Sequence, residues 1–195
     1  QCEFKDAGHI LGSTMMFLTV SGTTMVFTGD LGNSPSPLLR DTDSIKGATY
    51  LLMESVYGDR NHENRDERKE ILRKTILDSI AKGGVLMIPA FSIERTQELL
   101  FELNDMVEHH NIPDVKIFLD SPMAIKATEV YRRSDKYFNQ ETQHIIKSGD
   151  DIFKFPRLYM TESKEESMKI WETKGPKIIM AGSGMANGGR IVHHI

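Results

Sequence analysis

Several features common in proteins are missing from this chain, and each absence narrows its class. Only one cysteine, Cys2, occurs among the 195 residues, which excludes a disulfide-stabilised scaffold and favours a cytoplasmic protein. No apolar run approaches the roughly 18 residues that a membrane-spanning helix needs, so no membrane partner is expected. Positive charge is not in excess, because the formal net charge is -4. Any binding of phosphate must therefore be argued from particular loops rather than from overall charge.

The sequence does contain two successive patterns of secondary structure. Residues 14–28 hold two β-rich runs joined by Ser21 and Gly22, which predicts an antiparallel hairpin. From about residue 48, apolar runs typical of strands alternate with amphipathic stretches typical of helices. The expected strands are 50–54, 85–90, 115–120, 157–161 and 177–181, and the expected helices are 64–82, 94–110, 123–133 and 163–173.

The alternating part predicts an α/β fold in which a parallel sheet carries helices on both faces. In open sheets of this kind, ligands bind beyond the carboxyl ends of the strands, where helix N-termini present free N–H groups. Binding residues are therefore expected in four loops, which are 54–62, 89–95, 119–123 and 181–190.

Two short segments in the first part carry side chains suited to metal binding. His9 lies in Asp6-Ala-Gly-His-Ile-Leu-Gly-Ser, just before a strand, and a neutral imidazole is a common zinc ligand. Asp30 follows a strand directly in Thr28-Gly-Asp-Leu-Gly, and a carboxylate there can reach one metal ion or bridge two. Each segment alone is also consistent with an ordinary surface loop.

Together, these segments resemble the third and fourth metal motifs of the metallo-β-lactamase superfamily, and four later segments resemble its β-CASP branch. The four stand in the family's order, so that the resemblance spans nearly the whole chain; they are Glu54-Ser-Val-Tyr-Gly, Pro89-Ala-Phe-Ser-Ile-Glu-Arg-Thr-Gln-Glu, Leu119-Asp-Ser-Pro-Met-Ala and Ser183-Gly-Met-Ala-Asn-Gly-Gly-Arg. The resemblance implies antiparallel strands of a partial metallo-β-lactamase αββα sandwich over residues 1–48. It implies a β-CASP domain over residues 49–195, truncated at its C-terminal end.

The resemblance also implies zinc-dependent hydrolysis of RNA phosphodiester bonds. Two zinc ions would activate a water molecule, with His9 ligating one ion and Asp30 bridging both. Glu54 would lie near the metals and hold a histidine by a hydrogen bond rather than bind metal itself. His9, Asp30 and Glu54 are therefore the expected catalytic residues, and RNA is expected to lie in the cleft between the two domains.

Loop 181–190 contains residues suited to a phosphate group. Backbone N–H groups around Ser183 and Gly184 can cradle an anion, and Arg190 adds a forked, charged donor. A serine at the start of a helix is also an ordinary N-cap. The further RNA-binding candidates lie after other strands, or after the turn in loop 54–62; they are Ser92, Arg95, Ser121 and His62.

The metal ligands of this chain do not complete a two-zinc site. The family's upstream His-x-His-x-Asp-His string does not occur in the sequence, and neither do its two downstream histidine motifs. His193 and His194 are expected in a helix, where adjacent side chains diverge by about 100° and do not share a metal ion. We therefore expect the isolated fragment to bind zinc weakly and to be inactive, with catalysis belonging to the intact parent protein.

Two other interpretations are compatible with these motifs. A non-catalytic RNA-binding or scaffold paralogue would share the fold and lack metal ligands, whereas His9, Asp30 and Glu54 are all present here. A nucleotide-binding α/β domain is suggested by Gly182-Ser-Gly, although the third glycine of the dinucleotide fingerprint stands at the wrong spacing. The sequence is also compatible with a homodimer.

Overall fold

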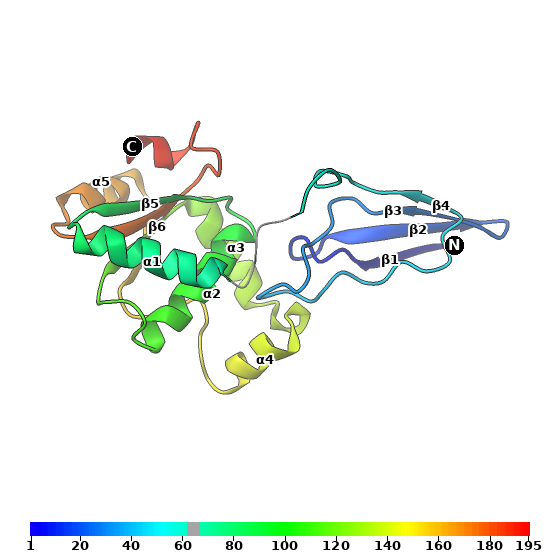
Figure 1. Cartoon of the computed structure of the whole chain (residues 1–195), viewed down its shortest axis with the longest axis horizontal. Helices are drawn as coiled ribbons and strands as arrows, with labels where there is room; N and C mark the ends of the chain where they lie inside the picture. The colour runs from blue at the N-terminus through cyan, green and yellow to red at the C-terminus, as the bar shows by residue number, and fades with distance from the viewer. Residues whose placement is uncertain (62–66) are drawn as a thin grey trace. The chain divides into compact units, whose positions relative to one another are not determined.

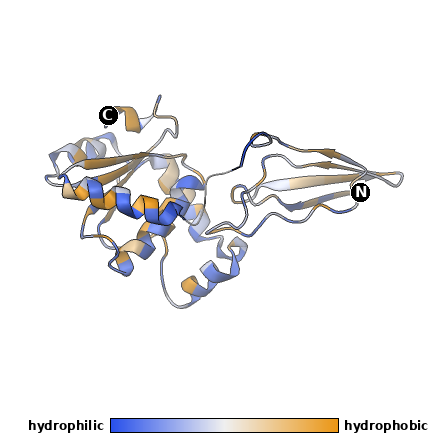
Figure 2. Cartoon of the chain, viewed as in Figure 1, coloured by the Kyte–Doolittle hydropathy of each residue, from blue (hydrophilic) through white to orange (hydrophobic). Residues whose placement is uncertain are grey.

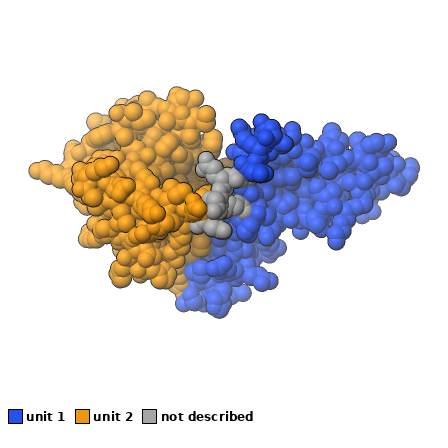
Figure 3. Space-filling view, viewed as in Figure 1, with its two compact units in different colours: residues 1–63, 134–148 blue, residues 64–133, 149–195 orange. Residues whose placement is uncertain are grey.

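The computed structural model describes residues 1–61 and 67–195, which form two compact units. Unit 1 comprises residues 1–63 and 134–148, and unit 2 comprises residues 64–133 and 149–195 (Figure 3). The segment 134–148 therefore belongs with the N-terminal part of the chain, although it lies between two helices of unit 2 in the sequence. Within the described ranges, no helix is long and apolar enough to cross a membrane.

Unit 1 contains a four-stranded sheet in the order β1-β2-β3-β4 (Figure 1). Its strands are β1 (Cys2–Asp6), β2 (Thr14–Val20), β3 (Thr23–Phe27) and β4 (Tyr50–Leu52). The first three pair antiparallel, and the β2–β3 hairpin turns at Ser21 and Gly22, whose φ angles of 49° and 78° suit a tight two-residue turn. The predicted hairpin is thus confirmed.

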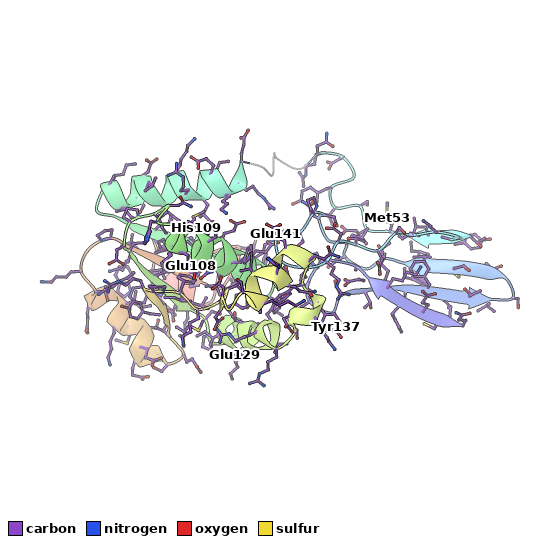
Figure 4. The ribbon with its side chains drawn as sticks, turned by 90° about the horizontal axis from the view of Figure 1, so that it is seen from below. Met53, Glu108, His109, Glu129, Tyr137 and Glu141 are labelled. Atoms are coloured by element: carbon purple, nitrogen blue, oxygen red, sulfur yellow. The ribbon has the colours of Figure 1, made fainter. Side chains whose placement is uncertain are left out.

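β4 departs from the predicted pattern. Residues 50–54 read as the first strand of the alternating part, yet β4 pairs parallel to β3 in the sheet of unit 1. That part of the prediction is wrong, because apolar character identifies a strand without identifying its neighbour. Tyr50, Leu51 and Leu52 are all exposed, as is Met53 directly after them (Figure 4).

The core of unit 1 lies on one face of its sheet. Met15 and Phe17 alternate along β2 and pack with Val26 and Ala7, and the partly buried Leu31 and Ile45 cover this cluster. Segment 134–148 holds the short turn η1 (Asp135–Tyr137) and α4 (Gln140–Lys147), where Tyr137 and Glu141 are labelled in Figure 4. Its backbone is tied to residues 38 and 39 by a hydrogen bond and a β-bridge, and the side chains of Asn139 and Thr142 donate to the carbonyls of Ser36 and Pro37.

Unit 2 contains a parallel sheet in the order β5-β8-β6-β7, flanked by helices (Figure 1). Its strands are β5 (Val85–Pro89), β6 (Lys116–Asp120), β7 (Leu158–Met160) and β8 (Lys177–Ala181). Its helices are α1 (Arg68–Ala81), α2 (Arg95–Glu108), α3 (Pro122–Arg132) and α5 (Lys164–Glu172), followed by the 3-10 turn η2 (Arg190–His193). The hydrophobic colouring along β5 and β8 shows how apolar these strands are (Figure 2).

The predicted strands and helices of unit 2 are confirmed within one or two residues wherever the structure describes them. The inner strand β8 is buried along its whole length, and after Lys177 its residues form a continuous apolar run rather than an alternating one. The helix expected at the end of the chain is instead the 3-10 turn η2. The mixed α/β fold class, with an antiparallel hairpin sheet followed by a parallel sheet, is as predicted.

Candidate functional site

The loop that carries His9 is held by its own hydrogen bonds. The hydroxyl of Ser13 accepts from the backbone N–H groups of His9 and Ile10, at 3.1 and 3.2 Å. The carboxylate of Asp6 accepts from the N–H of Gly8 at 2.9 Å. Asp6 and Ser13 thus fix both sides of His9, which is why short hydrogen-bonding side chains flank it in the sequence.

Two glycines let the His9 loop and the Asp30 turn touch through their backbones. The N–H of Gly32 donates to the carbonyl of Ala7 at 2.7 Å. A Cβ atom on Gly32 would lie 1.9 Å from the carbonyl oxygen of Gly8, and one on Gly8 would lie 2.9 Å from the backbone nitrogen of Thr42. No side chain fits at either position, so the glycines of both motifs serve a close backbone approach.

This approach brings the predicted metal ligands together. The Nε2 atom of His9 lies 4.0 Å from the Oδ2 atom of Asp30, and their side chains are 43% and 78% exposed. That separation is too long for a direct hydrogen bond and leaves both groups accessible to a third partner. An imidazole nitrogen beside a carboxylate oxygen fits zinc as two of its ligands. In the parts of the chain that the structure describes, no cluster of three or more potential metal ligands occurs.

Glu54 holds the backbone of the Asp30 turn. Its Oε1 atom accepts from the N–H of Leu31 at 2.7 Å. Its own N–H donates at 3.2 Å to the hydroxyl of Thr28, which in turn donates to the carbonyl of Gly29 at 2.7 Å. Glu54 therefore orients the turn around Asp30, whereas its expected hydrogen bond to a histidine stays a prediction.

In unit 2, three of the loops expected to bind ligands meet at the carboxyl ends of the strands. The hydroxyl oxygens of Ser92, after β5, and Ser121, after β6, lie 3.4 Å apart. A Cβ atom on Gly182, after β8, would lie 3.8 and 3.9 Å from these same oxygens. The hydroxyl of Ser121 also accepts from the N–H of Ala124 at 3.3 Å, so this serine is the N-cap of α3 as well.

Loop 182–190 closes on itself at a narrow neck. The N–H of Ile191 donates to the carbonyl of Gly182 at 2.9 Å, and the N–H of Ser183 donates to the carbonyl of Gly188 at 3.2 Å. Gly189 has a φ of 68°, and a Cβ atom there would lie 2.5 Å from the oxygen of Gly182. Beyond the neck, Gly184 lies against the exposed ring of Phe91, where a Cβ atom would approach the ring to 2.8 Å.

The predicted cationic contacts are directed to the protein itself. Arg95 donates to the carboxylate of Glu98 at 2.6 Å from an exposed position on α2. Arg190 donates through Nη1 to Asp120 at 2.6 Å and to the carbonyl of Thr161 at 3.1 Å, and through Nη2 to the carbonyl of Glu162 at 2.6 Å. His62 lies outside the described residues.

A buried cluster around Asp120 could not be recognised in the sequence. Its carboxylate accepts from the hydroxyls of Thr161 and Ser167, the guanidinium of Arg190 and Nε2 of His194. Burial acts to raise the pKa of Asp120, but these hydrogen bonds outweigh it and hold the pKa below its usual range. The sequence signal is a carboxylate at the end of a buried strand, with nothing to identify its partners.

Fold and site define an α/β protein that pairs an imidazole with a carboxylate in one unit and presents serine- and glycine-lined strand ends in the other. Residues 96–195 match the family model of the Beta-Casp domain, which is more than half of the chain. The chain therefore belongs to the β-CASP family of the metallo-β-lactamase superfamily.

Known relatives extend this similarity over the whole chain. Ribonuclease TTHA0252 of Thermus thermophilus is 39% identical, over 98% of this chain and 44% of the relative. The RNase J-like protein of Methanocaldococcus jannaschii is 32% identical, over 99% of this chain and 45% of the relative. Endoribonuclease YSH1 of Kluyveromyces lactis is 28% identical, over 94% of this chain and 24% of the relative. The chain thus spans less than half the length of these relatives.

Proposed function

We propose that this chain is part of a zinc-dependent ribonuclease that hydrolyses RNA phosphodiester bonds. The observation that carries the proposal is the approach of His9 Nε2 to Asp30 Oδ2, 4.0 Å apart and both accessible. Family membership supports the reaction class, since relatives of this chain are named as ribonucleases. An exposed pair of this kind contributes little to stability, so both groups can turn to a metal ion at small cost to the fold.

His9 and Asp30 would hold the metal, and Glu54 would keep their geometry. Zinc, when bound, makes water acidic enough to act as a nucleophile near neutral pH, and two ions per active site are proposed. Glu54 restrains the turn around Asp30 through the N–H of Leu31. The carboxylate of Asp30 is therefore presented without having to be ordered when the metal binds. The Gly8–Gly32 contact keeps the imidazole beside it.

Other parts of the intact protein would supply the remaining ligands. Two donors do not complete a four-coordinate zinc site, and relatives are more than twice the length that this chain matches. The exposed side chains of Tyr50, Leu51, Leu52 and Met53 support the same proposal, because four successive large apolar residues at one edge strand are more often covered by protein than left in water.

RNA would be held by groups at the carboxyl edge of the unit 2 sheet. The hydroxyls of Ser92, Ser121 and Ser183 and the backbone of Gly184 can donate hydrogen bonds to a phosphate. Such neutral donors suit a chain whose net charge is -4, because they bind the phosphodiester locally without a basic surface. Arg95 would contribute charge from its exposed position, where its ion pair with Glu98 is weak.

The test compares RNA cleavage and zinc content of the intact protein with those of an Asp30→Ala variant. We expect the variant to lose zinc and to cleave at least ~100-fold more slowly, as expected for removal of a metal-bridging group. Glu3→Ala is the matched control, because Glu3 carries an exposed carboxylate in the same unit and lies outside the loops expected to bind ligands.

Two results would contradict the proposal. Zinc-free protein that still cleaves RNA at the normal rate would remove the metal mechanism. RNA binding without zinc or cleavage would favour the non-catalytic paralogue instead.

A further inference from the structure

The side chain of Asp120 joins four parts of unit 2 at one buried point. Oδ1 accepts from Thr161 Oγ1 at 2.7 Å and from Arg190 Nη1 at 2.6 Å. Oδ2 accepts from Ser167 Oγ at 2.6 Å and from His194 Nε2 at 2.8 Å. The carboxylate is fully buried, so it cannot itself touch a substrate.

Among these partners, Arg190 stands at the neck of loop 182–190. Of its neighbours, Ile191 donates its N–H to the carbonyl of Gly182, and Gly189 lies so close to that carbonyl that no Cβ atom would fit. The guanidinium spans the carboxylate of Asp120 and the carbonyls of residues 161 and 162, so the neck is fastened to the ends of both β6 and β7. Loss of this fastening removes the side-chain connection between the neck of the loop and the ends of β6 and β7.

The end of β6 presents Asp120 on one side of the sheet and Ser121 on the other. Side chains alternate along a strand, so Asp120 and Ser121 point in opposite directions at the end of β6. Asp120 faces β7 and α5, while Ser121 faces Ser92 and Gly182. Asp120 therefore fixes loop 182–190 through Arg190, while the hydroxyl of the next residue, Ser121, lies on the side of Gly182, where the loop begins.

We propose that Asp120 and Arg190 are positioning residues that fix loop 182–190 for a phosphate of RNA, and that Arg190 is not a phosphate ligand. The inference rests on the proposed function, since it gives the loop its task there. Turning Arg190 toward a phosphate would remove the cationic partner of a buried carboxylate, which is strongly unfavourable. The phosphate would instead meet the N–H groups and hydroxyl of the loop itself.

Salt dependence separates an anchoring arginine from one that binds phosphate. RNA affinity of the intact protein is measured with a single-stranded oligonucleotide under chelating conditions that stop cleavage, over a range of salt concentrations. We expect Arg190→Gln to weaken binding by about tenfold or more, as misplaced binding groups do, with an unchanged salt slope. Loss of a direct contact would instead reduce the slope by about 0.7 for one phosphate on single-stranded RNA. That smaller slope would overturn the inference.

Hydrogen exchange tests the anchoring without RNA. In Asp120→Asn and Arg190→Gln, the amides of Ser183 and Ile191 are expected to exchange faster, while that of Ala90, bonded to Ala181, stays protected. Arg157→Gln is the matched control, because Arg157 makes a bidentate pair with Asp114 at 2.8 and 2.7 Å on the surface of the same unit. Unchanged loop exchange in both test variants would overturn the inference.

A double variant and a conservative variant complete the design. Asp120→Asn combined with Arg190→Gln should weaken RNA binding no more than the stronger single change, because each single change already breaks the same connection between Asp120 and Arg190. Arg190→Lys should restore part of the affinity, since an ammonium can pair with Asp120 but does not reach the carbonyls as a fork does. Additive losses would overturn the inference. Wild-type protein that fails to bind or cleave RNA would remove the proposed function, while hydrogen exchange would still decide the anchoring.

Discussion

The close backbone approach between Gly32 and Gly8 gives the sharpest prediction. Replacing Gly32 by alanine would place a Cβ atom 1.9 Å from the carbonyl oxygen and 2.2 Å from the carbonyl carbon of Gly8. Both groups belong to backbone, so no side chain can rotate away to make room. The Asp30 turn has to separate from the His9 loop, which breaks the hydrogen bond from Gly32 N–H to Ala7 O and the alignment of the two proposed metal ligands.

The expected cost is at or above the upper end for overpacking, about 3 kcal/mol in the free energy of unfolding. Gly12→Ala is the control in the same loop, because nothing lies within 4 Å of a Cβ atom there and its φ is 87°. That change adds backbone strain of about 1–2 kcal/mol without any overlap. Gly32 carries no such positive φ, so the pair separates steric overlap from conformational strain.

Urea unfolding and RNA cleavage by the intact protein measure the two consequences. We expect Gly32→Ala to lose both stability and cleavage, whereas Gly12→Ala loses a smaller part of its stability and keeps cleavage and zinc. If Gly32→Ala unfolds at the same urea concentration as the wild type and cleaves normally, the two loops are not held by this contact.

Three further changes test other parts of the structure. Burial raises the pKa of Glu102 despite nearby Lys69, so ionised Glu102 costs stability. Glu102→Gln should therefore gain stability relative to wild type as pH rises through and above the carboxyl's ordinary pKa of 4.5, measured by thermal unfolding at several pH values. A difference in stability between variant and wild type that does not change with pH would contradict this. Ser121→Ala and Ser163→Ala each remove a helix N-cap and should each lower the free energy of unfolding by about 1 kcal/mol in urea. Only Ser121→Ala should also weaken RNA binding, and equal effects of the two changes on binding would count against a site at Ser121. Thr28→Val leaves the N–H of Glu54 without its hydroxyl acceptor and should lose about 1–3 kcal/mol in the same assay, a result that an unchanged midpoint would rule out.

Elements could be predicted where local pattern and packing agree. The strands and helices of unit 2 alternate with clear periodicity, and a buried parallel sheet demands the apolar runs found at β6 and β8. β4 could not be placed in this way. Its three exposed residues gain their partner, β3, from a segment more than 20 positions earlier, and no local signal encodes that pairing.

The candidate site divides in a similar manner. His9 and Asp30 could be predicted because each sits in a glycine-flanked motif next to a strand, and the structure brings them within 4.0 Å. Arg190 could be identified as a residue of interest, but its partners could not. Asp120 and Arg190 are 70 residues apart, and only the parallel order of β6 and β8 brings them together. Arg190 points to Asp120 because that carboxylate is buried, and the sequence does not show which carboxylates are buried.

The position of β4 at the end of its sheet also bears on how this chain behaves in solution. An edge strand offers a row of unpaired backbone donors and acceptors. In β4 the exposed side chains of Tyr50, Leu51 and Leu52 also favour pairing with another strand. Copies of the 195-residue chain should associate through these edges at high concentration. A charged residue in place of Leu51 should weaken this pairing between the β4 strands of two copies.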